Sequence, residues 1–154
     1  MSRSPLPSRA CPPFLTLALA IALAGCQRGA EPLPAPDYGS AACAICQATI
    51  SAPRFAAQLQ RADGTVLSFD DPACLFVALR SEAAAPRQVR FHDASADGWI
   101  DADAAWFARV PGQATPHTDG WVAYPSFAAA QDAVAAGGSG EILPFAQARE
   151  RIGR

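Results

Sequence analysis

The feature that most constrains the fold is an order of strand, turn and helix signals that occurs twice along the chain. In the first half, weakly alternating apolar residues predict two strands, and Asp63-Gly64 between them predicts a hairpin turn. Asp71 is expected to cap a helix that begins at Pro72. The expected elements are, in order, strands over 55–61 and 65–69, a helix from Pro72 that ends within 83–86, and a strand over 88–92.

The second half repeats this order. Ser126 and the pair Gly137-Gly138 predict the two ends of its helix. The expected elements are strands over 106–110 and 121–124 joined by a longer loop, the helix after Ser126, a strand over 141–145 and a short helix over 146–152. We therefore expect an α+β fold of two similar ββαβ units packed together, over 41–94 and 95–154, with the join near 94–105. The alternative is a chance similarity, because small α+β domains often show such runs.

Residues 1–25 are expected to be a signal peptide and not part of this fold. Two arginines precede an apolar run over 14–24 that is too short to span a bilayer. The Leu23-Ala-Gly-Cys26 stretch resembles the lipobox of bacterial lipoproteins, which implies cleavage before Cys26 and acyl chains on that residue. The alternative is an ordinary secretory signal with an incidental cysteine. Gln27 comes next, and the absence of Asp there favours an outer-membrane over an inner-membrane anchor.

Removal of residues 1–25 leaves 129 of the 154 residues, which is enough for one domain with a sizeable core. Residues 26–40 are rich in Pro, Ala and Gly and have no hydrophobic period, so we expect a lipidated, flexible tether there. Ten of the 12 basic residues remain, all of them Arg, against 14 acidic residues. This balance argues against nucleic acid or anionic lipid as partners. No second membrane segment is expected.

Three cysteines, Cys43, Cys46 and Cys74, follow Cys26. An odd number is unusual in an oxidising compartment, where thiols pair, so we expect either a buried inert thiol or a function that requires thiols. Cys43-Ala-Ile-Cys46 can chelate a metal ion or form a small disulfide. A thioredoxin-like motif needs a strand before it and a helix after it, and the Pro-rich stretch before this one disfavours that interpretation.

Cys74 and His117 are candidates to complete a metal site. Cys74 lies in the first turn of the expected helix, where unpaired N–H groups and the helix dipole favour a thiolate; the alternative is a buried cysteine packed on the preceding strand. His117 lies in a polar loop, where a histidine is usually only solvated. With the three cysteines it would give three sulfurs and one nitrogen. His92 is expected to bond to nearby backbone or to Asp93. No hydrolase-like triad or phosphate-binding loop is visible.

Motifs through nearly the whole chain after residue 25 occur in a fairly specific order and spacing. They are the lipobox, Cys43-Ala-Ile-Cys46 before Ala56-Ala57-Gln58, Gly64 before Phe69-Asp70-Asp71-x-x-Cys74, Trp99-Ile-Asp-Ala102, Ala105-Trp106-Phe107, Thr115-Pro116, and Ala123 before an Ala-rich helix that ends in Gly-Gly. This set resembles the nitrous oxide reductase accessory lipoproteins, the NosL-type copper chaperones. The resemblance implies a periplasm-facing copper(I)-binding protein, not an enzyme, that receives copper from donor proteins and helps to assemble the copper centres of nitrous oxide reductase. It also implies a fold of two ββαβ units.

The chain departs from that family at Ala48 and His117, where a methionine is usual. Its single Met is Met1, so no thioether ligand follows the signal peptide, and imidazole is an acceptable copper(I) ligand in its place. We therefore expect copper(I) to be held by Cys43 and Cys46 with His117, and Cys74 to have a supporting role. Two alternatives stay open: a zinc-stabilised structural lipoprotein with a Cys₃His site of these four residues, and an interaction lipoprotein with a Cys43–Cys46 disulfide.

Overall fold

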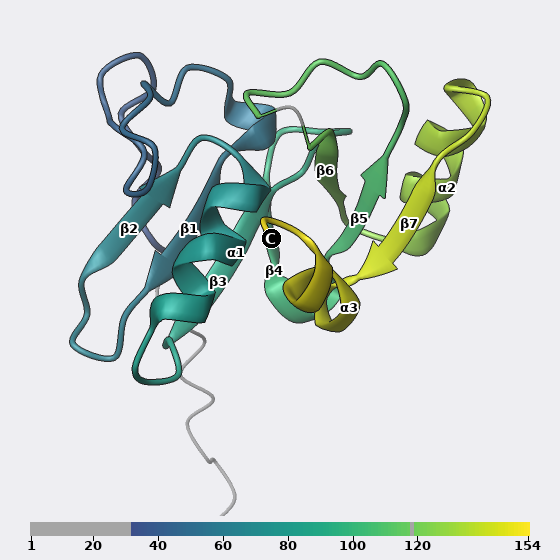
Figure 1. Cartoon of the computed structure of the whole chain (residues 1–154). Coiled ribbons are helices and arrows are strands. Elements are labelled where there is room, and N and C mark those ends of the chain that lie inside the picture. The colour runs from purple at the N-terminus through teal and green to yellow at the C-terminus, as the bar shows by residue number, and fades with distance from the viewer. Residues whose placement is uncertain (1–31, 118) are drawn as a thin grey trace, which may run out of the picture. The chain divides into compact units, whose positions relative to one another are not determined.

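Two antiparallel sheets and three helices make up the part of the chain that the computed structural model describes, residues 32–117 and 119–154 (Figure 1). The first sheet has the strand order β2-β1-β3-β4 and the second has the order β6-β5-β7. The strands are β1 (Ala57–Gln60), β2 (Val66–Phe69), β3 (Gln88–His92), β4 (Trp99–Asp101), β5 (Trp106–Arg109), β6 (Trp121–Tyr124) and β7 (Glu141–Pro144). The helices are α1 (Pro72–Ser81), α2 (Phe127–Ala136) and α3 (Phe145–Arg151), and single 3-10 turns occur at η1 (Pro53–Phe55) and η2 (Ala102–Ala104).

The two longer helices begin at the residues that the sequence predicts. The Asp71 carboxylate accepts the N–H of Ala73 at 2.7 Å, so it caps α1, and Pro72 takes the first helical position, where no N–H is needed. The Ser126 hydroxyl accepts the N–H of Ala129 at 3.1 Å and caps α2 in the same way. Both predicted caps are confirmed, and they fix where each helix leaves its preceding strand.

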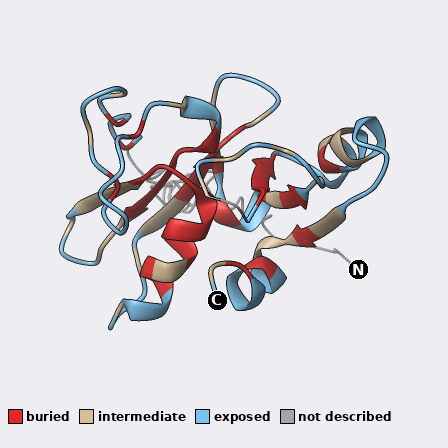
Figure 2. Cartoon of the chain, turned by 45° about the horizontal axis from the view of Figure 1, so that its top comes forward, coloured by how far each residue is buried: buried red, intermediate tan, exposed pale blue. Residues whose placement is uncertain are grey.

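Phenylalanines from both sheets form one shared core. The ring of Phe107 on β5 lies edge-on to Phe91 on β3, with centroids 4.7 Å apart, and edge-on to Phe76 on α1 at 5.2 Å. Phe145 of α3 contacts the same group, 5.9 Å from Phe76. Such aromatic pairs add to the stability that burial of their area supplies. Figure 2 shows that α1 is buried along most of its length and that buried strand segments continue into the second sheet.

The second sheet has apolar residues on both faces. Phe107 and Leu143 belong to the shared core, whereas Ala108, which follows Phe107 on β5, and Val122 on β6 belong to a second cluster with Ala130 of α2. Alternation of side chains along each strand separates these sets. The second sheet therefore lies between α2 and the shared core.

The first sheet is apolar toward α1 and polar on its other face. On that polar face, the Arg90 guanidinium bonds to the Gln58 side chain and to the carbonyl of Leu33 at 2.7 Å, and it lies 4.1 Å from the ring centre of Trp99. The Gln58 amide donates to the carbonyl of Pro34 at 3.0 Å. These bonds hold residues 33–34 on the sheet, and the tether expected over 26–40 stays a prediction.

The α+β class is confirmed, but the chain between the two halves differs from the prediction. Residues 94–105, expected as a join, contain β4, which pairs with β3 in the first sheet although it lies beyond the expected boundary at 94/95. Three residues are too few to show a period-two pattern, so this strand could not be recognised. The similarity of two ββαβ units stays a prediction.

The expected signal peptide and the expected lipidation of Cys26 lie outside the described residues. Within the described residues, no helix has the length and apolar character to cross a membrane.

Candidate metal centre

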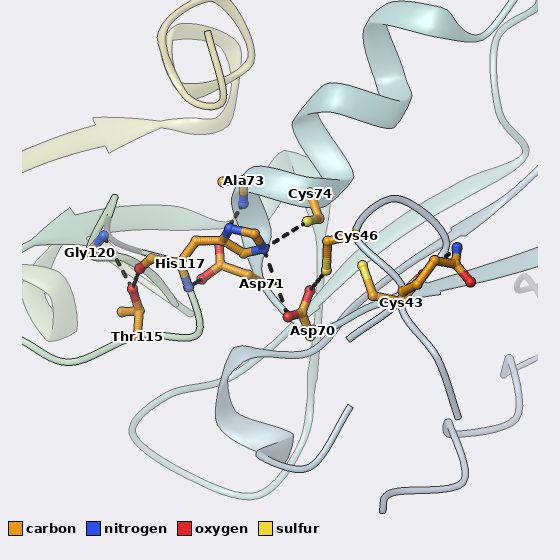
Figure 3. A network of polar contacts seen from close by, with 10 residues as sticks. Cys43, Cys46, Asp70, Asp71, Ala73, Cys74, Thr115, His117 and Gly120 are labelled. Carbon is orange, nitrogen blue, oxygen red and sulfur yellow. Dashed lines mark hydrogen bonds and ion pairs between the residues drawn. The ribbon is translucent and has the colours of Figure 1, made fainter. Parts of the chain in front are cut away.

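Three segments that are far apart in sequence meet at the N-terminus of α1 (Figure 3). The first is a turn that carries Cys43 and Cys46, the second is the connection from β2 to α1 with Asp70, and the third is the loop between β5 and β6 with His117. Figure 3 shows the imidazole of His117 turned toward the sulfur of Cys74 and the carboxylate of Asp70.

The cysteine turn lies at the tip of a small hairpin. An isolated bridge pairs Ala42 with Thr49, and the N–H of Cys43 donates to the carbonyl of Ala48 at 2.8 Å. Gln47 follows the second cysteine with φ 64°, the one positive φ at a non-glycine among the described residues. Its side-chain amide donates to the carbonyl of Cys43 at 3.1 Å. A non-glycine residue rarely adopts this left-handed conformation, and here it lies in the turn that carries both cysteines.

The connection from β2 to α1 supplies two adjacent carboxylates with different partners. Asp71 is fully buried and bonds to two backbone N–H groups, that of Ala73 at the start of α1 and that of His117 at 3.3 Å. Asp70, 4% exposed, faces the thiols instead. The S–H of Cys46 donates to Asp70 Oδ1 at 3.4 Å.

The four groups Cys43, Cys46, Cys74 and Asp70 each offer one donor atom, and these atoms all lie within 4.8 Å of one another. All but Cys46 are buried. The Nε2 atom of His117 lies 3.8 Å from Asp70 Oδ2. A buried carboxylate beside three thiols and one half-exposed imidazole has donor atoms in excess and little positive charge, which suits a bound cation.

His117 is held at the edge of this cluster by its own loop. Its Nε2 lies 3.1 Å from Cys74 Sγ. The hydroxyl of Thr115 donates to the carbonyl of His117 and accepts the N–H of Gly120 at 3.2 Å, and Gly120 has φ 70°. Together with the bond to Asp71, these contacts fix the backbone of the loop on the start of α1.

The thiols share protons unequally. The side chain of Cys74 lowers the pKa of Cys43 to about 6, and the backbone of Cys46 and Asp70 lowers it further against the opposing effect of burial. The side chain of Cys43, together with burial, raises the pKa of Cys74. Burial also raises the pKa of Cys46, and it raises that of Asp71 to about 6. These opposite shifts favour Cys43 as the thiol that loses its proton first.

The structure brings Cys43, Cys46 and Cys74 together and adds Asp70, whereas His117 lies beside this group and contacts it at Cys74 and Asp70. Cys43, Cys46 and Cys74 are free thiols. His92, which was expected to bond locally, donates from Nδ1 to the carbonyl of Asp93 at 3.0 Å and is not part of the cluster. Sequence reasoning missed Asp70 because a carboxylate before a helix is usually read as a cap, which here is the role of Asp71.

Three sulfurs with either an oxygen or a nitrogen can hold a soft or borderline metal ion. Zn²⁺ takes four ligands of this kind in a closed tetrahedral site, whereas soft thiolates also select Cu(I). The site could therefore hold a metal ion, and the donor set alone leaves the identity of the metal open.

Sequence comparisons with known proteins identify no relative of the chain. No protein-family model matches the chain, and no curated protein matches it either.

Proposed function

We propose that the chain binds copper(I) as cargo and passes it to a copper enzyme, and that it performs this role at the membrane. The observation that carries the proposal is the convergence of three thiols within 4.8 Å, with the imidazole of His117 beside one of them. Thiolates are preferred ligands of Cu(I), and imidazole is an acceptable one. In this proposal the protein acts as a copper chaperone and not as an enzyme.

The recipient and the location follow from the resemblance described above. Its motifs favour nitrous oxide reductase as the recipient, with donor proteins that supply the copper. Acyl chains on Cys26 would anchor the protein facing the periplasm, on the outer membrane in preference to the inner membrane. The proposed site agrees with this assignment, since its ligands include both cysteines of Cys43-Ala-Ile-Cys46 and the histidine that replaces the usual methionine.

The test is an anaerobic titration of the reduced protein with Cu(I) against the chromophoric chelator bicinchoninate. We expect one equivalent to bind, and we expect Cys46→Ala to abolish tight binding. A parallel titration with Zn²⁺ gives the affinity for zinc, with which the Cu(I) affinity is compared. A protein that holds Cu(I) no more tightly than a variant without its three thiols would contradict the proposal.

A zinc-stabilised structural lipoprotein is the second candidate. It is favoured by the number of close donors, because Asp70 or His117 would complete a closed set of four ligands with the cysteines. Stoichiometric zinc in the purified protein, with unfolding on chelation, would support this candidate in place of copper transfer.

A further inference from the structure

The four proposed copper ligands and the neighbouring Asp70 differ sharply in their access to solvent. Cys43 is 0% exposed, and Cys74 and Asp70 are each 4% exposed. In contrast, Cys46 is exposed, and the side chain of His117 is 38% exposed. The site therefore has a closed side and an open side.

The closed side is part of the hydrophobic core. Cys43 and Cys74 both pack in the main cluster with residues such as Phe69 and Leu75. Their positions are also fixed by the backbone, because Cys43 lies in the paired part of the hairpin and Cys74 in the first turn of α1. A donor group from another molecule cannot reach these positions without displacing core side chains.

The open side is the part of the cysteine turn that points away from the core. Ile45, which precedes Cys46, is 42% exposed, and it is one of two large apolar residues that are exposed in the described part of the chain. We call Ile45, Cys46 and His117 the exposed edge. It offers a partner two metal ligands and an apolar contact beside them.

We propose that copper enters and leaves the site through the exposed edge, where a partner protein presents its own thiol or thioether, while Cys43 and Cys74 retain the ion. This inference rests on the proposed function. In the transfer step, a sulfur of the partner forms a bond to Cu(I) as the bond from Cys46 breaks. A partner thiol gives its proton to the departing Cys46 thiolate, and a thioether transfers none, so that copper stays Cu(I) and no electrons move.

Chemical rescue by a small thiol tests this difference between the two sides. The full chain carrying Cys46→Ala has a gap that solvent can reach, whereas Cys74→Ala leaves a gap in the core. Cu(I) affinity is measured for both variants and for wild type by competition with bicinchoninate, with and without 2-mercaptoethanol. Wild type in the same thiol corrects for copper that the thiol itself binds.

We expect the thiol to raise the Cu(I) affinity of Cys46→Ala by about tenfold or more, and that of Cys74→Ala by less than about twofold. X-ray absorption should show that the rescued Cys46→Ala site regains one sulfur ligand. Cys74→Ser serves as the buried control if Cys74→Ala fails to fold. Equal rescue of both positions, or no rescue of either, would overturn this inference while copper binding by wild type keeps the proposed function. Absence of copper binding in wild type would overturn both.

Discussion

Two adjacent aspartates show how much depends on single residues. Asp71 turns into the protein and joins the start of α1 to the backbone of His117, whereas Asp70 faces three thiols. If the start of α1 moved by one residue, the aspartate that now caps the helix and the aspartate that now faces the thiols would no longer have these roles. Asp71 has an extended backbone, with φ −153° and ψ 145°, between β2 and α1. Neighbouring side chains of an extended chain point to opposite sides, which agrees with the different partners of Asp70 and Asp71.

At His117 we predict that substitution weakens copper binding without abolishing it. His117→Ala removes one nitrogen donor but leaves all three thiols, so the Cu(I) affinity should fall by about 10- to 100-fold. Competition titrations with bicinchoninate measure this effect. An unchanged Cu(I) affinity in the variant would remove His117 from the ligand set.

At Asp71 we predict a pH effect on the stability of the metal-free protein. Burial raises the pKa of Asp71 to about 6 in the folded state, from an ordinary value of 3.8. The folded state therefore binds more protons between these values, and the free energy of unfolding falls as the pH rises through this window, by an amount on the order of 3 kcal/mol. Asp71→Asn should lack this fall, because an amide does not titrate.

Urea unfolding of wild type and Asp71→Asn at several pH values provides the measurement. Asn still caps a helix, so the variant should fold, and any cost from the bond to His117 is independent of pH. A constant difference between the two proteins from pH 4 to 6.5 would show that Asp71 is ionised throughout.

The site residues that could be predicted from the sequence are those of a rare type that soft metal ions favour as ligands, namely the cysteines. Cysteines in the spacing of Cys43 and Cys46, and a cysteine in the first turn of a helix, stand out in any sequence. Asp70 does not, because acidic residues are common and because its role depends on side-chain direction. Cys74 and His117 are 43 positions apart in the sequence, so their distance in the fold could not be computed from spacing.

At the scale of elements, α1 connects stability with the site. Asp71→Ala should lower the free energy of unfolding by about 1–2 kcal/mol through loss of the helix cap. It should also weaken Cu(I) binding, because the loop of His117 loses its bond to α1. Thermal unfolding and copper competition titrations measure the two effects.

Ser126→Ala is the matched control for this prediction, since Ser126 caps α2 in the same manner. It should cost about 1 kcal/mol of stability and leave the copper affinity unchanged. Equal effects of the two variants on affinity would show that the site responds to overall stability and not to the position of its loop.

Helices and strands that have a cap, a turn or an alternating pattern in the sequence were predicted, whereas β4, which has none of these, was missed. The capped starts of α1 and α2 and the bounds of β3 and β6 agree with the prediction. In contrast, β4 exists because β3 has a free edge beside it, and Phe91 and Ile100 pair across that edge. Such pairing depends on the neighbouring strand in the folded sheet, so the sequence of a three-residue strand does little to predict it.

At the scale of the whole molecule, the shared core predicts one unfolding transition. Phe107 of the second sheet packs on Phe76 and Phe91, so Phe107→Ala should cost about 3–5 kcal/mol and destabilise both sheets together. Variants that keep either Trp99 in the first sheet or Trp121 in the second report on each sheet by fluorescence. Coincident transitions are expected, and separate midpoints would mean that the sheets unfold independently.

Arg90 holds the first described residues on the polar face of the first sheet. Arg90→Ala removes its bonds to the carbonyl of Leu33 and to Gln58, so this segment should become accessible to proteases at lower concentrations than in wild type. Limited proteolysis followed by mass spectrometry locates the cuts. Copper affinity should not change, and an unchanged cleavage pattern would show that other contacts suffice to hold the segment.

The shared core also determines what would happen if the chain were cut. A break within η2, between Asp103 and Ala104, would give one fragment with the first sheet and another with the second. Each fragment would contain only part of the phenylalanine cluster, so neither has a complete interior of its own. The metal ligands divide as well, with the cysteines on one fragment and His117 on the other. The two fragments are therefore expected to associate. Coordination of one metal ion by the cysteines of one fragment and His117 of the other would show that they had done so.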